Sequence, residues 1–130
     1  MSILMRILMS TRLLAGIGAM TLGLLHWFFR ISFIEFHMLF GLLLTLTLLS
    51  AGIVALFTKG VRALGAIAIG FALIVPVFGI TQMQILVGDF HWLIRVVHLL
   101  VGVAAVSLTG RICEQIKQKL VAGKEAVKAS

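Results

Sequence analysis

Four long apolar stretches dominate the pattern of hydrophobic and polar positions along the chain. Each is close to the roughly 20 residues that a helix needs to cross the hydrocarbon core of a bilayer. The pattern predicts an all-α fold, an integral membrane four-helix bundle of up-down-up-down order. We expect a single domain over 1–130, with a basic tail over 111–130 and helices at about 3–30, 34–58, 61–82 and 90–118.

The composition agrees with a membrane setting and excludes an ordinary soluble domain. Apolar residues make up 62% of the chain and charged residues 12%. A soluble domain of this size covers its core with polar groups, which this chain does not have in sufficient number. We therefore expect membrane lipid as the main surroundings of the helices.

The net charge of +7 lies at the ends of the apolar stretches. Basic residues cluster near the N-terminus, around 59–62 and over the C-terminal 111–128, whereas only Arg30 and Arg95 lie near the opposite membrane face. By the positive-inside rule both termini and the 59–62 link are cytoplasmic. The basic tail is expected to lie against anionic lipid head groups, and no nucleic acid partner is expected.

All the histidines of the chain fall toward the extracytoplasmic ends of the predicted helices: His26, His37, His91 and His98. His91 and His98 are seven residues apart, which puts them on one stripe of a helix with Arg95 between them. A histidine inside a bilayer is costly unless a partner satisfies it, so the group indicates a functional site.

Glycine follows two of these histidines at helical spacing, Gly41 after His37 and Gly102 after His98. A glycine one turn from an imidazole leaves room for a flat macrocycle, and haem with two histidine ligands takes one from each of two facing helices. Arg30 or Arg95 would then neutralise the haem propionates. Zinc or copper and a chlorophyll-type pigment are the other ligands considered.

The paired glycines favour His37 and His98 as the two ligands of the haem iron. His26 with His98 is the competing pair, and His91 is expected at the rim of the site. One haem b is expected; two haems that use all four histidines are the alternative. Arg95 has a second interpretation, an ion pair with Glu35.

The segment Phe36–Leu44, FHMLFGLLL, resembles the second-helix pattern of the bacterial b-type membrane cytochromes that include superoxide oxidase and hydrogenase cytochrome subunits. Four membrane helices and histidines near the start of the second and fourth are similar too. The resemblance implies the bacterial inner (plasma) membrane and haem near the extracytoplasmic face. It also implies electron exchange with quinone or a redox partner, with His37 and either His91 or His98 as axial ligands.

The favoured function is thus a haem-binding electron-transfer subunit, alone or in a larger respiratory complex, and an enzyme only as an oxidoreductase component. The alternatives are a cofactor-free accessory subunit, in which the histidines make polar helix contacts, and a pigment-binding membrane subunit. A hydrolase is disfavoured, because no serine or cysteine accompanies the histidines as a nucleophile.

Overall fold

The computed structural model describes residues 3–129, which form helices and turns and include no strand. The chain folds into four long helices and one short 3-10 helix: α1 (Ile3–Phe29), α2 (Ile34–Leu56), α3 (Arg62–Thr81), η1 (Gln82–Gln84) and α4 (His91–Ala129). The first three long helices end within two residues of the expected limits. α4 continues past 118 to Ala129, because the last residues contain no proline to stop it.

All four long helices are long and apolar enough to cross a membrane. Their outward faces carry large apolar side chains such as Ile17, Leu73 and Ile80, which are 64%, 63% and 68% exposed. In water a continuous apolar surface of this kind drives association, whereas lipid chains solvate it. The exterior of the bundle therefore suits lipid.

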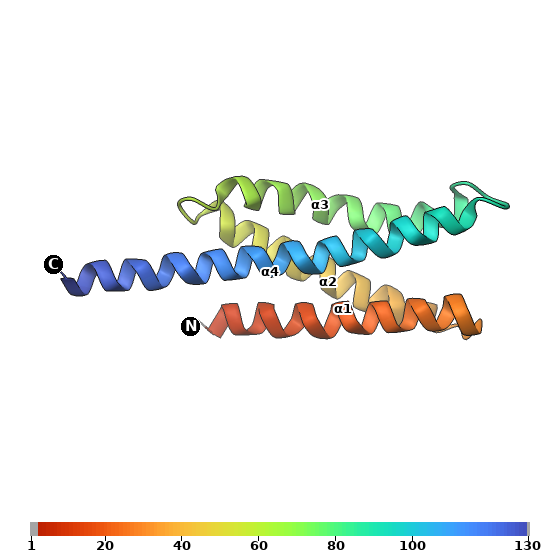
Figure 1. Ribbon diagram of the computed structural model, residues 1–130, viewed down its shortest axis with the longest axis horizontal. Coiled ribbons are helices and arrows are strands. Elements are labelled where there is room, and N and C mark those ends of the chain that lie inside the picture. Colours follow the sequence, from red (N-terminus) through yellow and green to blue (C-terminus); the bar gives the residue numbers. More distant parts are fainter. Residues whose placement is uncertain (1–2, 130) are drawn as a thin grey trace.

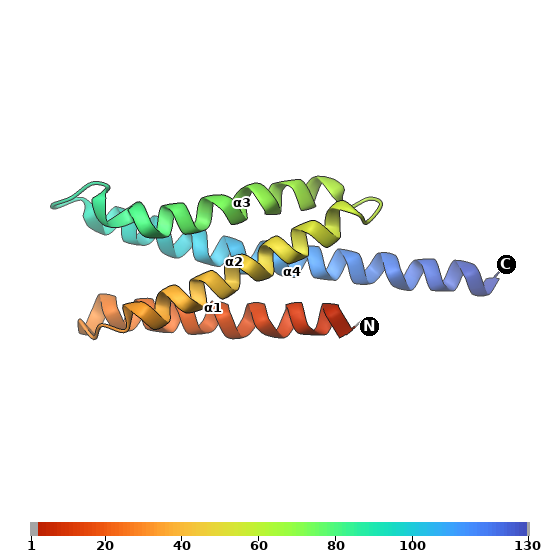
Figure 2. The ribbon, with the colours of Figure 1, turned by 180° about the vertical axis from the view of Figure 1, so that it is seen from behind.

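The bundle has two middle helices and two edge helices (Figures 1 and 2). α2 and α4 contact each other and both remaining helices, whereas α1 and α3 make no contact with one another in the part of the chain described. α2 is the most buried of the four. Residues on α2 and α4 can thus meet directly in the centre.

The two ends of the bundle differ in composition. One end, here called the histidine end, holds the 30–33 and 85–90 connections; the other, the basic end, holds the 57–61 connection and the start of α1 (Figure 1). The C-terminal part of α4 projects beyond the basic end, as both ribbon views show. The histidines and most of the basic residues therefore lie at opposite ends.

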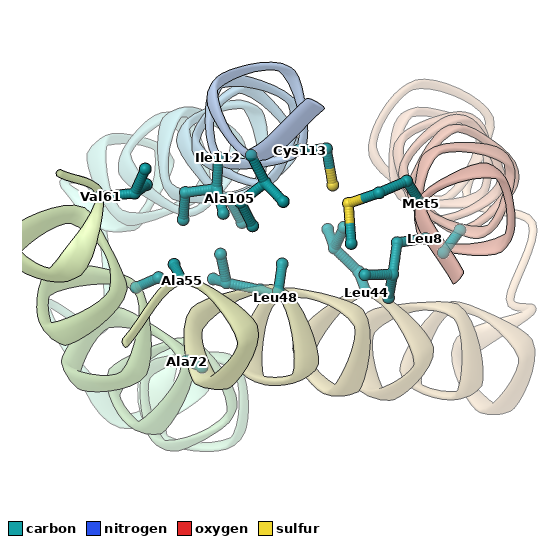
Figure 3. Close-up of a cluster of buried hydrophobic side chains, with 14 residues drawn as sticks. Met5, Leu8, Leu44, Leu48, Ala55, Val61, Ala72, Ala105, Ile112 and Cys113 are labelled. Atoms are coloured by element: carbon teal, nitrogen blue, oxygen red, sulfur yellow. The ribbon is translucent and has the colours of Figure 1, made fainter. Parts of the chain in front are cut away.

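The apolar core fills the middle and the basic end. Figure 3 shows Met5 and Leu8 of α1 pointing toward Leu44 of α2 and Cys113 of α4, all of them buried. Cys113 packs as a small apolar side chain here, and its thiol is free. These contacts join the middle helices to α1.

Arg12 also joins α1 to α4. Its Nη1 donates to the backbone oxygen of Val106 at 3.2 Å. The guanidinium occupies the space left by Gly110, where any Cβ would collide with it. A partly buried cation bonded to a backbone carbonyl fixes the axial position of α1 against α4, since a shift by one turn would leave it without that acceptor.

The contact between α2 and α3 includes a close approach of the two backbones at Gly52 and Gly65. A Cβ at Gly65 would lie 2.7 Å from the carbonyl oxygen of Gly52 and 2.8 Å from the backbone nitrogen of Leu56. Small residues at these positions let the two helices approach closely, which is how helices gain packing energy in lipid. α3 is thereby placed against α2.

Substitution of Gly65 by alanine should destabilise the protein, because its Cβ would overlap immovable backbone. Overpacking of this kind costs about 1–3 kcal/mol. Thermal unfolding in detergent micelles, followed by circular dichroism, should show a lower midpoint for Gly65→Ala. The matched control is Gly70→Ala in the same helix, whose Cβ would meet nothing within 4 Å. Equal midpoints for the two variants would contradict the close contact.

Candidate functional site

The structure brings two of the four histidines together at the histidine end. The rings of His37 on α2 and His98 on α4 lie with their centroids 5.8 Å apart and their planes at 50°. Both side chains are partly buried. The direct contact of the middle helices brings the two rings together. His37 lies in the first turn of α2, whereas His98 lies two turns into α4.

The ring of His37 is fixed by α1. Its Nδ1 lies 2.8 Å from the backbone oxygen of Ala19. A carbonyl oxygen only accepts, so Nδ1 carries the proton and donates, which leaves the lone pair on Nε2. A Cβ at Gly23 would lie 3.1 Å from Cε1 of His37, so this glycine makes room for the ring. His37 thus has a defined tautomer and orientation.

The ring of His98 lies against α3. The Phe78 ring has its centroid 5.9 Å from that of His98, at an interplanar angle of 33°. A Cβ at Gly79 would be in ordinary contact with Cε1 of His98, at 3.7 Å. Nδ1 of His98 is buried and has no hydrogen-bond partner within residues 3–129. A buried polar atom without a partner is costly, which marks His98 as a site where a further group would be stabilising.

The other two histidines have different surroundings. His91 is partly buried, and its Nδ1 lies 3.3 Å from the backbone oxygen of Ile85, so it ties the 85–90 connection to the start of α4. His26 is exposed on the last turn of α1. Among the residues that the structure describes, no three histidine, cysteine, aspartate or glutamate side chains lie close enough to hold a metal ion together. The arrangement is one pair of imidazoles.

The two glycines expected to lie beneath the ligands do not contact the histidine rings. A Cβ at Gly41 or at Gly102 would meet nothing within 4 Å, so both positions border open space. The glycines that contact the rings are Gly23 and Gly79 instead. Each glycine lies one helical turn from its histidine, and the space beside it holds no side chain.

Arg30 and Arg95 are exposed at the histidine end. Arg30 has a positive φ of 57° where the chain leaves α1. The alternative ion pair of Arg95 with Glu35 is not formed; within the described chain the one pair found is that of Lys117 with Glu114, 3.7 Å apart on α4. Both arginines keep their donors available to groups outside the chain.

Sequence reasoning missed the contributions of the edge helices. α1 supplies Ala19 and Gly23, which the sequence shows only as part of a stripe of small residues, and α3 supplies Phe78 and Gly79. Nothing in the sequence of α3 distinguishes these two residues from its other apolar positions. Every long helix therefore lines the imidazole pair.

Comparison of the chain with known protein families, with curated proteins and with solved structures finds no match.

Substitution of Gly23 by valine should push His37 away from α1, because added methyl groups would occupy the place of its ring. We expect a lower thermal midpoint in detergent, which corresponds to a loss of about 1–3 kcal/mol in the free energy of unfolding. Gly70→Val on α3 is the matched control, since its side chain would enter open space. An undiminished midpoint in Gly23→Val would show that His37 does not pack on α1.

Proposed function

We propose that the protein is a membrane-embedded haem b subunit that transfers electrons near one membrane face, in which His37 and His98 would hold the haem iron. The observation that carries this proposal is the pair of imidazoles that α2 and α4 present to each other, 5.8 Å apart between ring centroids. One ligand from each of two facing helices is the usual arrangement for haem held by two histidines in a helical bundle.

The donor set fits a shared iron in several respects. His37 and His98 would hold the iron between two facing helices, and their ring centroids already lie 5.8 Å apart. The bond of His37 Nδ1 to the oxygen of Ala19 leaves Nε2 as the coordinating atom, and such a bond to a carbonyl is typical of metal-ligating histidines. Coordination also gives the otherwise poorly satisfied His98 ring a strong partner.

The neighbouring residues orient and shield the pair. Gly23 and Gly79 let the rings seat against α1 and α3, and Phe78 covers one side of His98 with an apolar face. Gly41 and Gly102 leave space one turn away on the two ligand-bearing helices. Arg30 and Arg95, exposed at the same end, provide cations for the propionates. When bound, the haem would supply one-electron redox chemistry.

The orientation follows from the distribution of charge. The basic end carries the N-terminal, 59–62 and C-terminal basic residues, and such an excess lies on the cytoplasmic side in most helical membrane proteins. In an up-down-up-down bundle with both termini cytoplasmic, His37 and His98 lie toward the extracytoplasmic face. Quinone in the membrane or a redox protein at that face would be the electron partner.

A cofactor-free accessory subunit is the second candidate. One observation favours it: His37 already bonds to the Ala19 oxygen and packs against His98, so the pair also works as a polar contact between helices. On this interpretation the histidines hold the bundle together, and the protein is colourless.

A visible spectrum of the purified protein distinguishes the two candidates. After expression with ample haem, we expect a reduced-minus-oxidised difference with sharp b-type bands, at about one haem per chain. His98→Ala should abolish the bands, because it removes a ligand. His91→Ala, which affects only the hydrogen bond to Ile85, should retain them. A colourless wild-type protein, or full haem content in His98→Ala, would refute the proposal.

Gly41→Leu should lower haem content without unfolding the protein. Its side chain would enter space that no residue of the chain occupies, so the apoprotein should tolerate it. Gly41 lies one turn from His37 on the same helix, so a large side chain there should hinder haem binding and pigment should be lost. Gly70→Leu provides the control, because it also faces open space but lies on α3. Haem per chain should be measured by pyridine haemochrome, and the fold by circular dichroism. Equal haem content in the two variants would place the haem elsewhere.

A further inference from the structure

The end of α4 projects beyond the other helices (Figures 1 and 2). Lys119 lies beside the 57–61 connection, since its Cε would be 3.3 Å from a Cβ at Gly60, and residues 120–128 beyond it are exposed. Residues 120–129, here called the α4 extension, continue the same unbroken helix. An isolated helix of this length is marginally stable in water, so a packing partner would stabilise it.

The α4 extension continues the face of α4 that packs inside the bundle. Ile112 and Ile116 on this face are 0% and 2% exposed. At helical spacing the face continues through Leu120 and Gly123, and Leu120 is 47% exposed. The result is an apolar stripe whose first half is covered by the bundle and whose second half is not. A stripe of this kind is the recognition surface that another helix takes.

Lysines flank the exposed half of the stripe on both sides. Helical geometry places Lys119 along one edge and Lys124 and Lys128 along the other. None of the three makes an ion pair with an acidic side chain in residues 3–129, and Glu125 lies on the opposite side of the helix. A shallow groove follows the stripe at Gly123, lined by Lys119, Leu120, Gly123, Lys124, Val127 and Lys128.

We propose that the α4 extension binds an acidic amphipathic helix of a partner protein, whose apolar residues cover Leu120 and whose carboxylates meet the three lysines. Complementary charge selects this occupant over the others. A second copy of the chain would set lysine against lysine. A bilayer surface would require the helix to bend and lie flat, whereas α4 continues straight out of the bundle (Figure 2). The proposal is independent of whether haem is bound.

The full chain in nanodiscs of zwitterionic phosphatidylcholine provides the test. The probe is a fluorescein-labelled peptide of three heptads with leucine at a and d and glutamate at e and g, whose own charges keep it from pairing with itself. We expect saturable binding by fluorescence anisotropy that weakens with added salt. Leu120→Asn should weaken it about tenfold, whereas Val121→Asn, of similar exposure but outside the stripe, should change it less than about twofold.

Three results would overturn the proposal. The first is no saturable binding, or equal binding of a peptide with lysine in place of glutamate. The second is an equal effect of the two asparagine variants. The third is contact with lipid. A fluorophore can be attached to a Leu120→Cys variant, because the native Cys113 thiol is buried and does not react. Quenching of this fluorophore by brominated lipid in nanodiscs of phosphatidylglycerol would overturn the proposal. No quenching is expected for a helix that projects from the membrane.

Discussion

The direct contact between α2 and α4 is the interaction on which the proposed site depends. In a four-helix arrangement the two helices of one diagonal must approach each other before their side chains can share a ligand. Here α1 and α3 lie apart, and the middle helices fill the centre. The glycine contact with α3 and the Arg12 bond between α1 and α4 hold the edges in place around this pair. The imidazoles meet because α2 and α4, which carry them, pack directly against each other.

The sequence was sufficient to predict the helices and to place His37 and His98 toward the same end of the bundle, because hydrophobic length and helical spacing are local properties. It was insufficient to predict which surfaces these histidines touch. Gly41 and Gly102 lie at the right spacing along their own helices, yet the rings turn toward Gly23 and Gly79 of the neighbouring ones. The rotation of a helix about its own axis is set by packing against helices that are distant in sequence. The residue pattern of one helix therefore does not predict which neighbour each side chain faces.

The two histidines are not equivalent, although their spacing treats them alike. His37 is held by a carbonyl oxygen and has one proton position, whereas the Nδ1 of His98 is buried without an acceptor in the described chain. If the two rings serve as the proposed ligands, one fixed and one unanchored ring would differ in basicity. The anchoring of His37 comes from α1, which contributes a backbone group and a glycine rather than a functional side chain.

One unbroken helix carries both His98 and the α4 extension. About 33 Å of rigid helix separates His98 from Leu120 at 1.5 Å per residue. A rod of this kind tilts as a whole, and Arg12 on Val106 provides a point near its middle about which it is held. A force at the projecting end would therefore act through a lever, and a small sideways displacement there would change the spacing of the imidazoles at the other end of the bundle.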